Sequence, residues 1–364
     1  MKTLLPAQSV LLLLLASACI PLKPTTKNDV FPGRAQLPQE EAPHPKNSLE
    51  WWYVTGHLND TKTGQAFGVE YVFFHFNPTG RRDYQMAHLA LTDPQTQQFY
   101  YDYDLGRLPA PLPATLPLNL SEANNRSRKR PGGSAQTWSL TGQEGRYRFQ
   151  ARMANTAGQA IDLTTTPTKP VLLHGGGTGY EQYGPVAQAG YYSYPRLATT
   201  GTVEVGGQKH EVTGELWYDR QWNCGGVNNK DVAWDWLSIQ LNEPREELML
   251  YTVHQTKTGQ HIGGGTHNGP QNQTQHLNEA DFKLEPLTYW TSSASKKKYP
   301  ATWRVQVPGQ GYDLTITPLV PQQELNLKIF KFFRLSYWEG MCRVSGTHHG
   351  KPVTGQAYVE ITNR

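Results

Sequence analysis

Gly214-Glu-Leu-Trp-Tyr-Asp-Arg-Gln-Trp222, followed by Ala233-Trp-Asp-Trp-Leu-Ser-Ile-Gln-Leu241, decides the fold of this chain. The aromatic and apolar content of both stretches predicts two neighbouring β-strands. Successive side chains of a strand point to opposite faces. The first strand therefore presents Tyr218, Arg220 and Trp222 on one face and Trp217, Asp219 and Gln221 on the other.

The second strand places one carboxylate, Asp235, on an otherwise aliphatic face. An unpaired charge there is costly, so Asp235 must be paired, hydrogen-bonded or protonated, and Arg220 is one candidate partner. Aromatic walls with a few polar groups are typical of a pocket for an apolar ligand. The alternative is an aromatic sheet core in which backbone amides bind the aspartate. Asp235 shares its face with Leu237, Ile239 and Leu241, opposite Trp234, Trp236, Ser238 and Gln240.

Strand and turn signals dominate the rest of the 364 residues. The chain contains 34 Gly, 26 Pro and 19 Tyr, and no segment has a long helical periodicity. Many short strands with turn signals predict an all-β barrel or sandwich. The predicted strands are 68–76, 86–92, 147–153, 202–205, 209–213, 247–254, 302–307, 312–316 and 358–361.

Two segments, 50–58 and 234–241, echo each other, because each opens with tryptophan and an acid and continues as an apolar strand. Two similar barrels in tandem would explain this repeat. We expect an N-terminal domain at 48–220 and a C-terminal domain at 221–364. The mouth of a closed barrel is a natural ligand site.

The N-terminus has the pattern of an export signal. Residues 1–18 contain Lys2, the apolar run 10–15 and small residues before Cys19. Cys19 fits a bacterial lipoprotein processing site, so we expect lipidation there and a periplasmic, membrane-anchored protein, at the outer membrane. Residues 19–47 are proline-rich and predict an extended tether. The alternative is cleavage after Ala18 and a soluble secreted protein.

Charge and motifs argue against several classes of function. A net charge of +4 is too small to favour nucleic acid, and the basic run 126–130 predicts a solvated loop, with an anionic membrane surface as the alternative. No histidine or cysteine spacing fits a metal site and no phosphate-binding loop is found, so we expect neither metal nor cofactor. The run 174–177, His-Gly-Gly-Gly, is like a lipase oxyanion loop, but the chain lacks Gly-x-Ser-x-Gly. We therefore expect a flexible turn there. Cys224 and Cys342 could pair in an oxidising compartment.

Several blocks carry a family resemblance. They are 50–58, 86–93, 173–175 leading to 190–193, 214–222, 234–236, 337–340 and 355–360. Together they resemble the carotenoid 1,2-hydratase (hydroxyneurosporene synthase) and AttH-like family over nearly all of residues 48–364. The resemblance implies two lipocalin-like barrels, a ligand pocket near their junction and hydration of isolated double bonds. Trp52, His88 and Tyr192 lie in these blocks and are expected to bind the ligand.

One departure from the family concerns the proton donor. The typical run is Trp-x-Asp-His-Glu-Trp, whereas this chain has Trp217-Tyr-Asp-Arg-Gln-Trp222. Arg220 replaces the histidine that family hydratases would use, and arginine is a poor general acid because it stays protonated.

Two functions of different classes remain open. The first is a cofactor-free hydratase, lyase or isomerase-like enzyme for an isoprenoid or lipid-like substrate. Its expected catalytic groups are Asp235 for proton transfer, Arg220 as anchor and Asp219, and its expected pocket walls are Tyr218, Trp222 and Trp236. The second is a lipid-anchored carrier that uses the same pocket without chemistry. Hydrolysis is a further alternative that rests on family naming.

Overall fold

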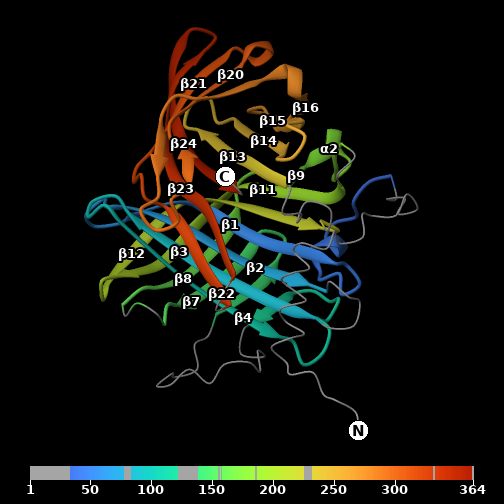
Figure 1. The fold of residues 1–364 in the computed structure, drawn as a ribbon, viewed down its shortest axis with the longest axis vertical. Helices are drawn as coiled ribbons and strands as arrows, with labels where there is room; N and C mark the ends of the chain where they lie inside the picture. The colour runs from blue at the N-terminus through green and yellow to red at the C-terminus, as the bar shows by residue number, and fades with distance from the viewer. Residues whose placement is uncertain are drawn as a thin grey trace.

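The computed structural model describes residues 33–77, 83–121, 138–154, 156, 158–184, 187–224, 232–330 and 333–362. The expected signal peptide, Cys19 and the basic run 126–130 lie outside these residues. The described part is nearly all β and forms two large curled sheets, one above the other in Figure 1. Within these ranges, no helix is both long enough and apolar enough to cross a membrane.

The first sheet has the strand order β4-β3-β2-β1-β12-β11-β8-β7-β6-β5, and β9 and β10 also pair with β11. Gly206 and Gly207 join β11 to β12 as the predicted glycine-rich turn, and their φ angles of 60° and 82° are ones that glycine adopts without strain. The strands are β1 (Leu49–Asp60), β2 (Ala66–Phe76), β3 (Tyr84–Asp93), β4 (Gln98–Arg107), β5 (Leu118–Ser121), β6 (Ser139–Gln143), β7 (Arg146–Arg152), β8 (Ala160–Pro167), β9 (Leu172–Leu173), β10 (Tyr180–Tyr183), β11 (Ala187–Val205) and β12 (Gln208–Trp222).

The second sheet has the order β16-β15-β14-β13-β24-β23-β21-β20-β17, and β22 also pairs with β23. Its strands are β13 (Val232–Leu241), β14 (Glu247–Gln255), β15 (His261–Asn268), β16 (Thr274–Asn278), β17 (Lys283–Pro286), β20 (Trp303–Val307), β21 (Tyr312–Pro318), β22 (Glu324–Phe330), β23 (Phe333–His348) and β24 (Lys351–Thr362). β18 (Tyr289–Thr291) and β19 (Lys298–Pro300) form a separate pair. The short helical turns are η2 (Gln39–Glu41), α2 (His174–Gly177), η4 (Glu279–Asp281) and η5 (Pro308–Gln310).

The two sheets repeat one topology. The first strand of each sheet, β1 or β13, pairs with the next strand, β2 or β14, and with the last strand, β12 or β24. The echo in the sequence therefore marks equivalent strands, and the predicted all-β fold of two tandem lipocalin-like barrels is confirmed. The first sheet ends at Trp222 and the second begins at Val232, so the expected boundary between 220 and 221 falls inside β12.

The central strands of each sheet are buried on both faces. One face lines the core of the strand's own barrel, and the other packs against the opposite sheet. On β12, Tyr218 and Trp222 belong to the first core while Trp217 belongs to the layer between the sheets, which we call the junction. On β13, Leu237 belongs to the second core and Trp236 to the junction. Strands that are covered on both sides have apolar residues on both faces, and β12 and β13 have this pattern.

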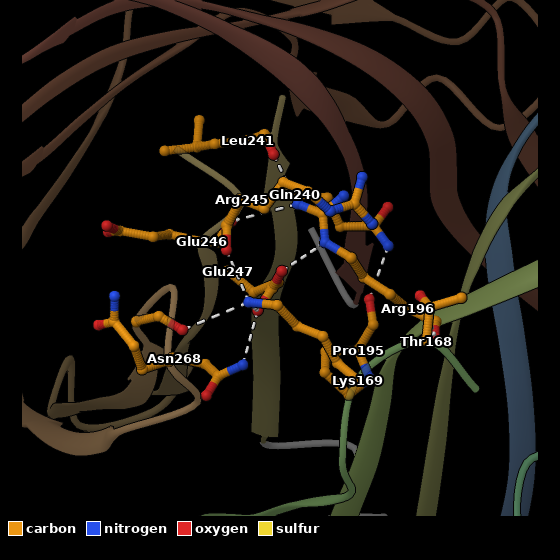
Figure 2. A network of polar contacts seen from close by, with 12 residues as sticks. Thr168, Lys169, Pro195, Arg196, Gln240, Leu241, Arg245, Glu246, Glu247 and Asn268 are labelled. Carbon is orange, nitrogen blue, oxygen red and sulfur yellow. Dashed lines mark hydrogen bonds and ion pairs between the residues drawn. The ribbon is translucent and has the colours of Figure 1, made fainter. Parts of the chain in front are cut away.

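The junction extends beyond the paired faces. β22 and the start of β23 lie across β2, β3 and β4 of the first sheet (Figure 1), where Leu325 and Leu327 pack against Met86 and Ala90. A network of buried ion pairs and hydrogen bonds joins the sheets at another place (Figure 2).

Residues 33–47 correct the expected tether. This segment packs against the first sheet and buries Ala35, Glu41 and Ala42. The indole Nε1 of Trp52 donates to the carbonyl of Glu41 over 3.1 Å. Backbone carbonyls of the segment thus satisfy donors at the end of the first barrel, which composition alone does not indicate. Residues 19–32 lie outside the described part.

The predicted disulfide is wrong. Cys224 and Cys342 are buried free thiols. Cys224 packs in the junction, whereas Cys342 points into the core of the second barrel, so the two side chains lie in different layers.

Candidate functional site

Arg220 points into the first barrel, where Glu50 is its ionic partner. Its Nη2 lies 2.5 Å from the Glu50 carboxylate, and its guanidinium lies 4.1 Å from the centre of the Trp52 ring. Burial alone would raise the pKa of Glu50, but the Arg220 charge and hydrogen bonds from His44 and His75 hold it well below its usual range. The pairing of Arg220 with Asp235 that the sequence suggested is therefore not formed.

Five expected site residues gather inside the first barrel. Tyr192 lies 6.2 Å from Trp222 and 6.3 Å from Tyr218 between ring centres. The hydroxyls of Tyr192 and Tyr218 are buried without a hydrogen-bond partner among the described residues. The five residues are Trp52, Tyr192, Tyr218, Arg220 and Trp222.

Asp219 points the other way, into the junction. Three donors reach its carboxylate: Tyr191 over 2.7 Å, Trp217 over 2.5 Å, and the hydroxyl of Ser193. Trp236 of the second sheet in turn donates to the Tyr191 hydroxyl over 2.9 Å. Burial raises the pKa of Asp219 to about 7, although these hydrogen bonds favour the charged form.

Glu360 of the second sheet faces Asp219 across the junction. It lies on β24 between Trp236 of β13 and Glu339 of β23 in the strand register. Burial and the charge of Asp219 raise the pKa of Glu360 to about 7, while the neighbouring Trp234 indole partly opposes this. Glu360 and Trp234 are half-buried, so this end of the junction is the accessible one.

Two further carboxyl groups, Glu70 and Glu339, lie fully buried beside this pair. Burial, with the charge of Glu360, raises the pKa of Glu70 well above its usual range, and burial with the charges of Glu70 and Glu360 does the same for Glu339. The Tyr53 hydroxyl donates to Glu339. Among the described residues, no lysine or arginine forms a salt bridge with any of the four carboxyl groups. Burial therefore favours the protonated form of Glu70 and of Glu339.

His88 lies in this cluster as a neutral imidazole, because burial lowers its pKa to about 3. Its Nδ1 lies 3.0 Å from Glu70 and its Nε2 lies 2.8 Å from the Tyr337 hydroxyl. The neutral imidazole donates from one of these two nitrogens and accepts at the other. The second carboxyl oxygen of Glu70 and the hydroxyl of Tyr358 are buried with no partner among the described residues.

Asp235 lies apart from this cluster, on the side of β13 that faces the second core. His254 Nε2 lies 2.9 Å from its carboxylate. The expected site residues thus fall in three places: five in the first barrel, Asp219, Trp236 and His88 in the junction, and Asp235 beside His254.

The sequence reasoning missed Glu70, Glu339 and Glu360 as site residues. Each is an acid between apolar neighbours of a strand, which is the signal that singled out Asp235. The described residues contain no group of three or more His, Cys, Asp or Glu side chains arranged to hold a metal ion.

The two lipocalin-like barrels, joined through a buried acidic layer, define a class of two-barrel all-β proteins. Residues 29–364 match the AttH-like family model, and the chain belongs to that family.

Three known proteins are similar to this chain in sequence or in structure. Kievitone hydratase of Fusarium solani subsp. phaseoli is 26% identical over 216 residues, which cover 58% of this chain and 59% of that enzyme. A crystal structure of a protein assigned as AttH from Nitrosomonas europaea has a TM-score of 0.74 and 26% identity, covering 92% of this chain and 98% of the other. The crystal structure of kievitone hydratase from Nectria haematococca has a TM-score of 0.65, covering 93% and 94% of the two chains; at 20% identity it supports the fold alone.

Proposed function

We propose that the protein is a cofactor-free hydratase or dehydratase that transfers protons at the junction of its two barrels, on an apolar, isoprenoid-like or lipid-like substrate. The observation that carries the proposal is the pair Asp219 and Glu360, whose pKa values both lie at about 7 in an aromatic, largely buried layer. Two carboxyl groups with pKa values of about 7 are each partly protonated at neutral pH, so that one can act as acid and the other as base. The relation to kievitone hydratase supports this class of reaction.

The chemistry needs both forms of the pair. In hydration, protonated Asp219 gives its proton to an alkene carbon, and the π electrons form the new C–H bond. Water then attacks the resulting carbocation and loses a proton to ionised Glu360. Trp217 and Trp236 adjoin Asp219 in the junction, and their ring faces can stabilise the cation. Dehydration is the reverse sequence.

The test is turnover of kievitone and of prenylated or polyene analogues in ¹⁸O-labelled water. The expected result is one ¹⁸O in the product for the unaltered protein, and a loss of about a hundredfold or more in kcat for Asp219→Asn and for Glu360→Gln. The variant Asp235→Asn tests whether proton transfer belongs to Asp219 and Glu360 or to Asp235, which was the expectation from the sequence. Loss of turnover in Asp235→Asn, with activity retained in Asp219→Asn, would return the role to Asp235.

A carrier function is the second candidate, because the first barrel holds the buried, unpartnered hydroxyls of Tyr192 and Tyr218. A carrier would release its ligand unchanged. Native mass spectrometry of the purified protein, followed by analysis of the released compound before and after incubation, separates the two functions.

We also propose that the protein acts at the periplasmic face of a membrane through lipid on Cys19. The signal-like N-terminus supports this. Cys19→Ser should then move the protein from the membrane fraction to the soluble fraction, and a soluble unaltered protein would contradict the anchor.

A further inference from the structure

We infer that His174 and Ser193 form a proton relay that reprotonates Asp219 from the side of β16. The inference rests on the proposed function, because it gives Asp219 the role of the acid that must be recharged. The run 174–177, which resembled an oxyanion loop without a matching nucleophile, thereby gains a role.

The relay is a continuous chain of hydrogen bonds. Thr266 Oγ1 lies 2.8 Å from Nδ1 of His174, and Nε2 of His174 lies 2.7 Å from Oγ of Ser193. The Ser193 hydroxyl donates to Oδ1 of Asp219. His174 and Ser193 are fully buried, and Thr266 is 2% exposed, so water does not compete for these contacts.

The direction of each bond follows from the single proton on Ser193. That proton is given to Asp219, so Nε2 of His174 must be the donor to Ser193. Burial, reinforced by the nearby His276, lowers the pKa of His174 to about 3, so the imidazole is neutral and its Nδ1 accepts from Thr266. Every hydrogen bond therefore points toward Asp219.

This polarity excludes Ser193 as a nucleophile of the serine-hydrolase kind. A nucleophilic serine gives its proton to the histidine, and the aspartate orients the histidine. Here the aspartate binds the serine directly and the histidine is a donor. The relay therefore moves a proton toward Asp219 and does not activate the Ser193 oxygen.

The local backbone explains how His174 reaches Ser193. Ser193 lies opposite both Asp219 on β12 and Leu172 on β9 in the register of β11. His174 follows β9 directly and begins the tight turn α2. Gly175 has φ of 60°, and a Cβ there would lie 1.8 Å from the carbonyl oxygen of Tyr180, so only glycine permits this turn.

His276 lies beside Thr266, the outer end of the relay. It is half-buried and lies opposite Thr266 in the register of β15 and β16. Its Nδ1 is buried with no partner among the described residues, and its charge acts on both His174 and Glu181. The groups that face His174 are thus His276, Thr266, Ser193 and the Tyr191 ring, with Glu181 bound to the amide of Gly175.

One turn of the relay is balanced in protons. A proton arriving at the Thr266 hydroxyl lets Thr266 pass its own proton to Nδ1 of His174, Nε2 releases its proton to Ser193, and Ser193 releases its own proton to the Asp219 carboxylate. One proton enters and one is delivered, and rotation of the two hydroxyls with return of the imidazole to its first tautomer resets the relay. Each hydration consumes the Asp219 proton, and the proton that water loses goes to Glu360, so separate recharging of Asp219 is required.

The test uses Ser193→Ala and His174→Gln in the full chain, with Tyr251→Phe as the matched control. Tyr251→Phe removes a buried hydroxyl that bonds Glu181 but touches neither Asp219 nor the relay. In the two relay variants kcat should fall about tenfold to a hundredfold with KM unchanged, the solvent deuterium isotope effect on kcat should rise, and added imidazole buffer should restore part of the rate. Loss of rate without buffer rescue and with an unchanged isotope effect would reduce the two residues to structural roles and overturn the relay.

A second measurement does not depend on turnover. After a rapid pH jump across 7, the carboxyl stretching band that Asp219→Asn removes should follow the jump quickly in the unaltered protein and slowly in Ser193→Ala. Equal rates would overturn the relay even if the protein is a hydratase. A slow rate in Ser193→Ala would support the relay even if no substrate is turned over.

Discussion

Glu70 shows at the residue scale how a buried acid sets the pH dependence of stability. It is fully buried, one of its carboxyl oxygens lies 3.0 Å from Nδ1 of His88, and the other has no partner among the described residues. Such a group is tolerated only while it is protonated.

We predict that Glu70→Gln stabilises the protein at pH 8 and changes it little at pH 4. The unfolded glutamate ionises near pH 4.3, whereas the folded pKa is raised by burial and by Glu360. Between these two values the folded state holds a proton that the unfolded state has lost. The contribution of Glu70 to stability therefore falls as pH rises, by at most about 1.4 kcal/mol per pH unit. Glutamine keeps a donor for His88 and removes this loss.

The measurement is chemical denaturation of both proteins from pH 4 to pH 8. Glu279→Gln is the control, because that side chain is 46% exposed. A Glu70→Gln variant that is less stable than the unaltered protein at every pH would show that Glu70 is ionised in the fold.

At the residue scale, the sequence predicts which side chains share a strand face, but it does not predict which residues they contact. Alternation correctly separates Tyr218 and Arg220 from Trp217 and Asp219. It does not show which face lines a barrel and which lines the junction, because both faces are buried and aromatic. The partner of Arg220 is Glu50, which is distant in sequence and is brought close by the pairing of β1 with β12.

At the scale of elements, the contacts of segment 33–47 also could not be predicted from the sequence. The strands carry their own signals in β-branched and aromatic residues, and the hairpin of β11 and β12 carries a signal in two glycines. Segment 33–47 has the proline-rich composition of a linker, yet it is held by backbone carbonyls and by the side chains of Glu41 and His44. Glu41 binds Tyr194 and the amide of Glu144, which are distant in sequence, so this docking could not be predicted from residue types.

We predict that removing this segment destabilises the first barrel. A chain that starts at Ser48 lacks the Glu41 carbonyl that accepts from Trp52 and the Ala42 carbonyl that accepts from Arg220 over 2.9 Å. Each buried donor left without an acceptor costs about 1–3 kcal/mol, so the loss should be on the order of 2–6 kcal/mol.

Thermal melts of chains that start at residue 33 and at residue 48 measure this loss. Equal melting temperatures would mean that the segment is an accessory tether after all. The single substitution Gln39→Ala keeps both carbonyls and changes an exposed side chain of the same segment, so it is the control and should preserve most of the stability that the truncation removes.

At the scale of the whole molecule, the two barrels share a site, so their relative placement matters. Asp219 belongs to the first sheet and Glu360 to the second. Their mutual effect on pKa exists only while the sheets are held together. The aromatic layer of the junction supplies most of the contact area, and area alone allows sliding because the hydrophobic effect is not directional.

Arg196 makes directional polar contacts across this interface. Its guanidinium, on β11, bonds Glu247 of β14 and the carbonyl of Leu241 in the second sheet (Figure 2). It also bonds Glu215 of its own sheet over 2.6 Å. Lys169 reaches the same Glu247 carboxylate over 2.9 Å. The Arg196 and Glu247 side chains are 2% and 0% exposed, so salt screens their interaction little.

We predict that Arg196→Met lowers stability by about 3–5 kcal/mol, the typical cost of breaking a buried ion pair. It should also separate the unfolding of the two barrels into two calorimetric transitions, because Lys169 alone then joins the first sheet to Glu247. Arg148→Met is the matched control. It removes a pair with Asp162 whose side chains are 51% and 42% exposed, and should cost no more than about 1 kcal/mol in one transition. If Arg196→Met instead melts like Arg148→Met, the aromatic layer and the other hydrogen bonds across the junction, such as Trp236 to Tyr191, fix the barrels, and the placement of Asp219 near Glu360 does not depend on the Arg196 network.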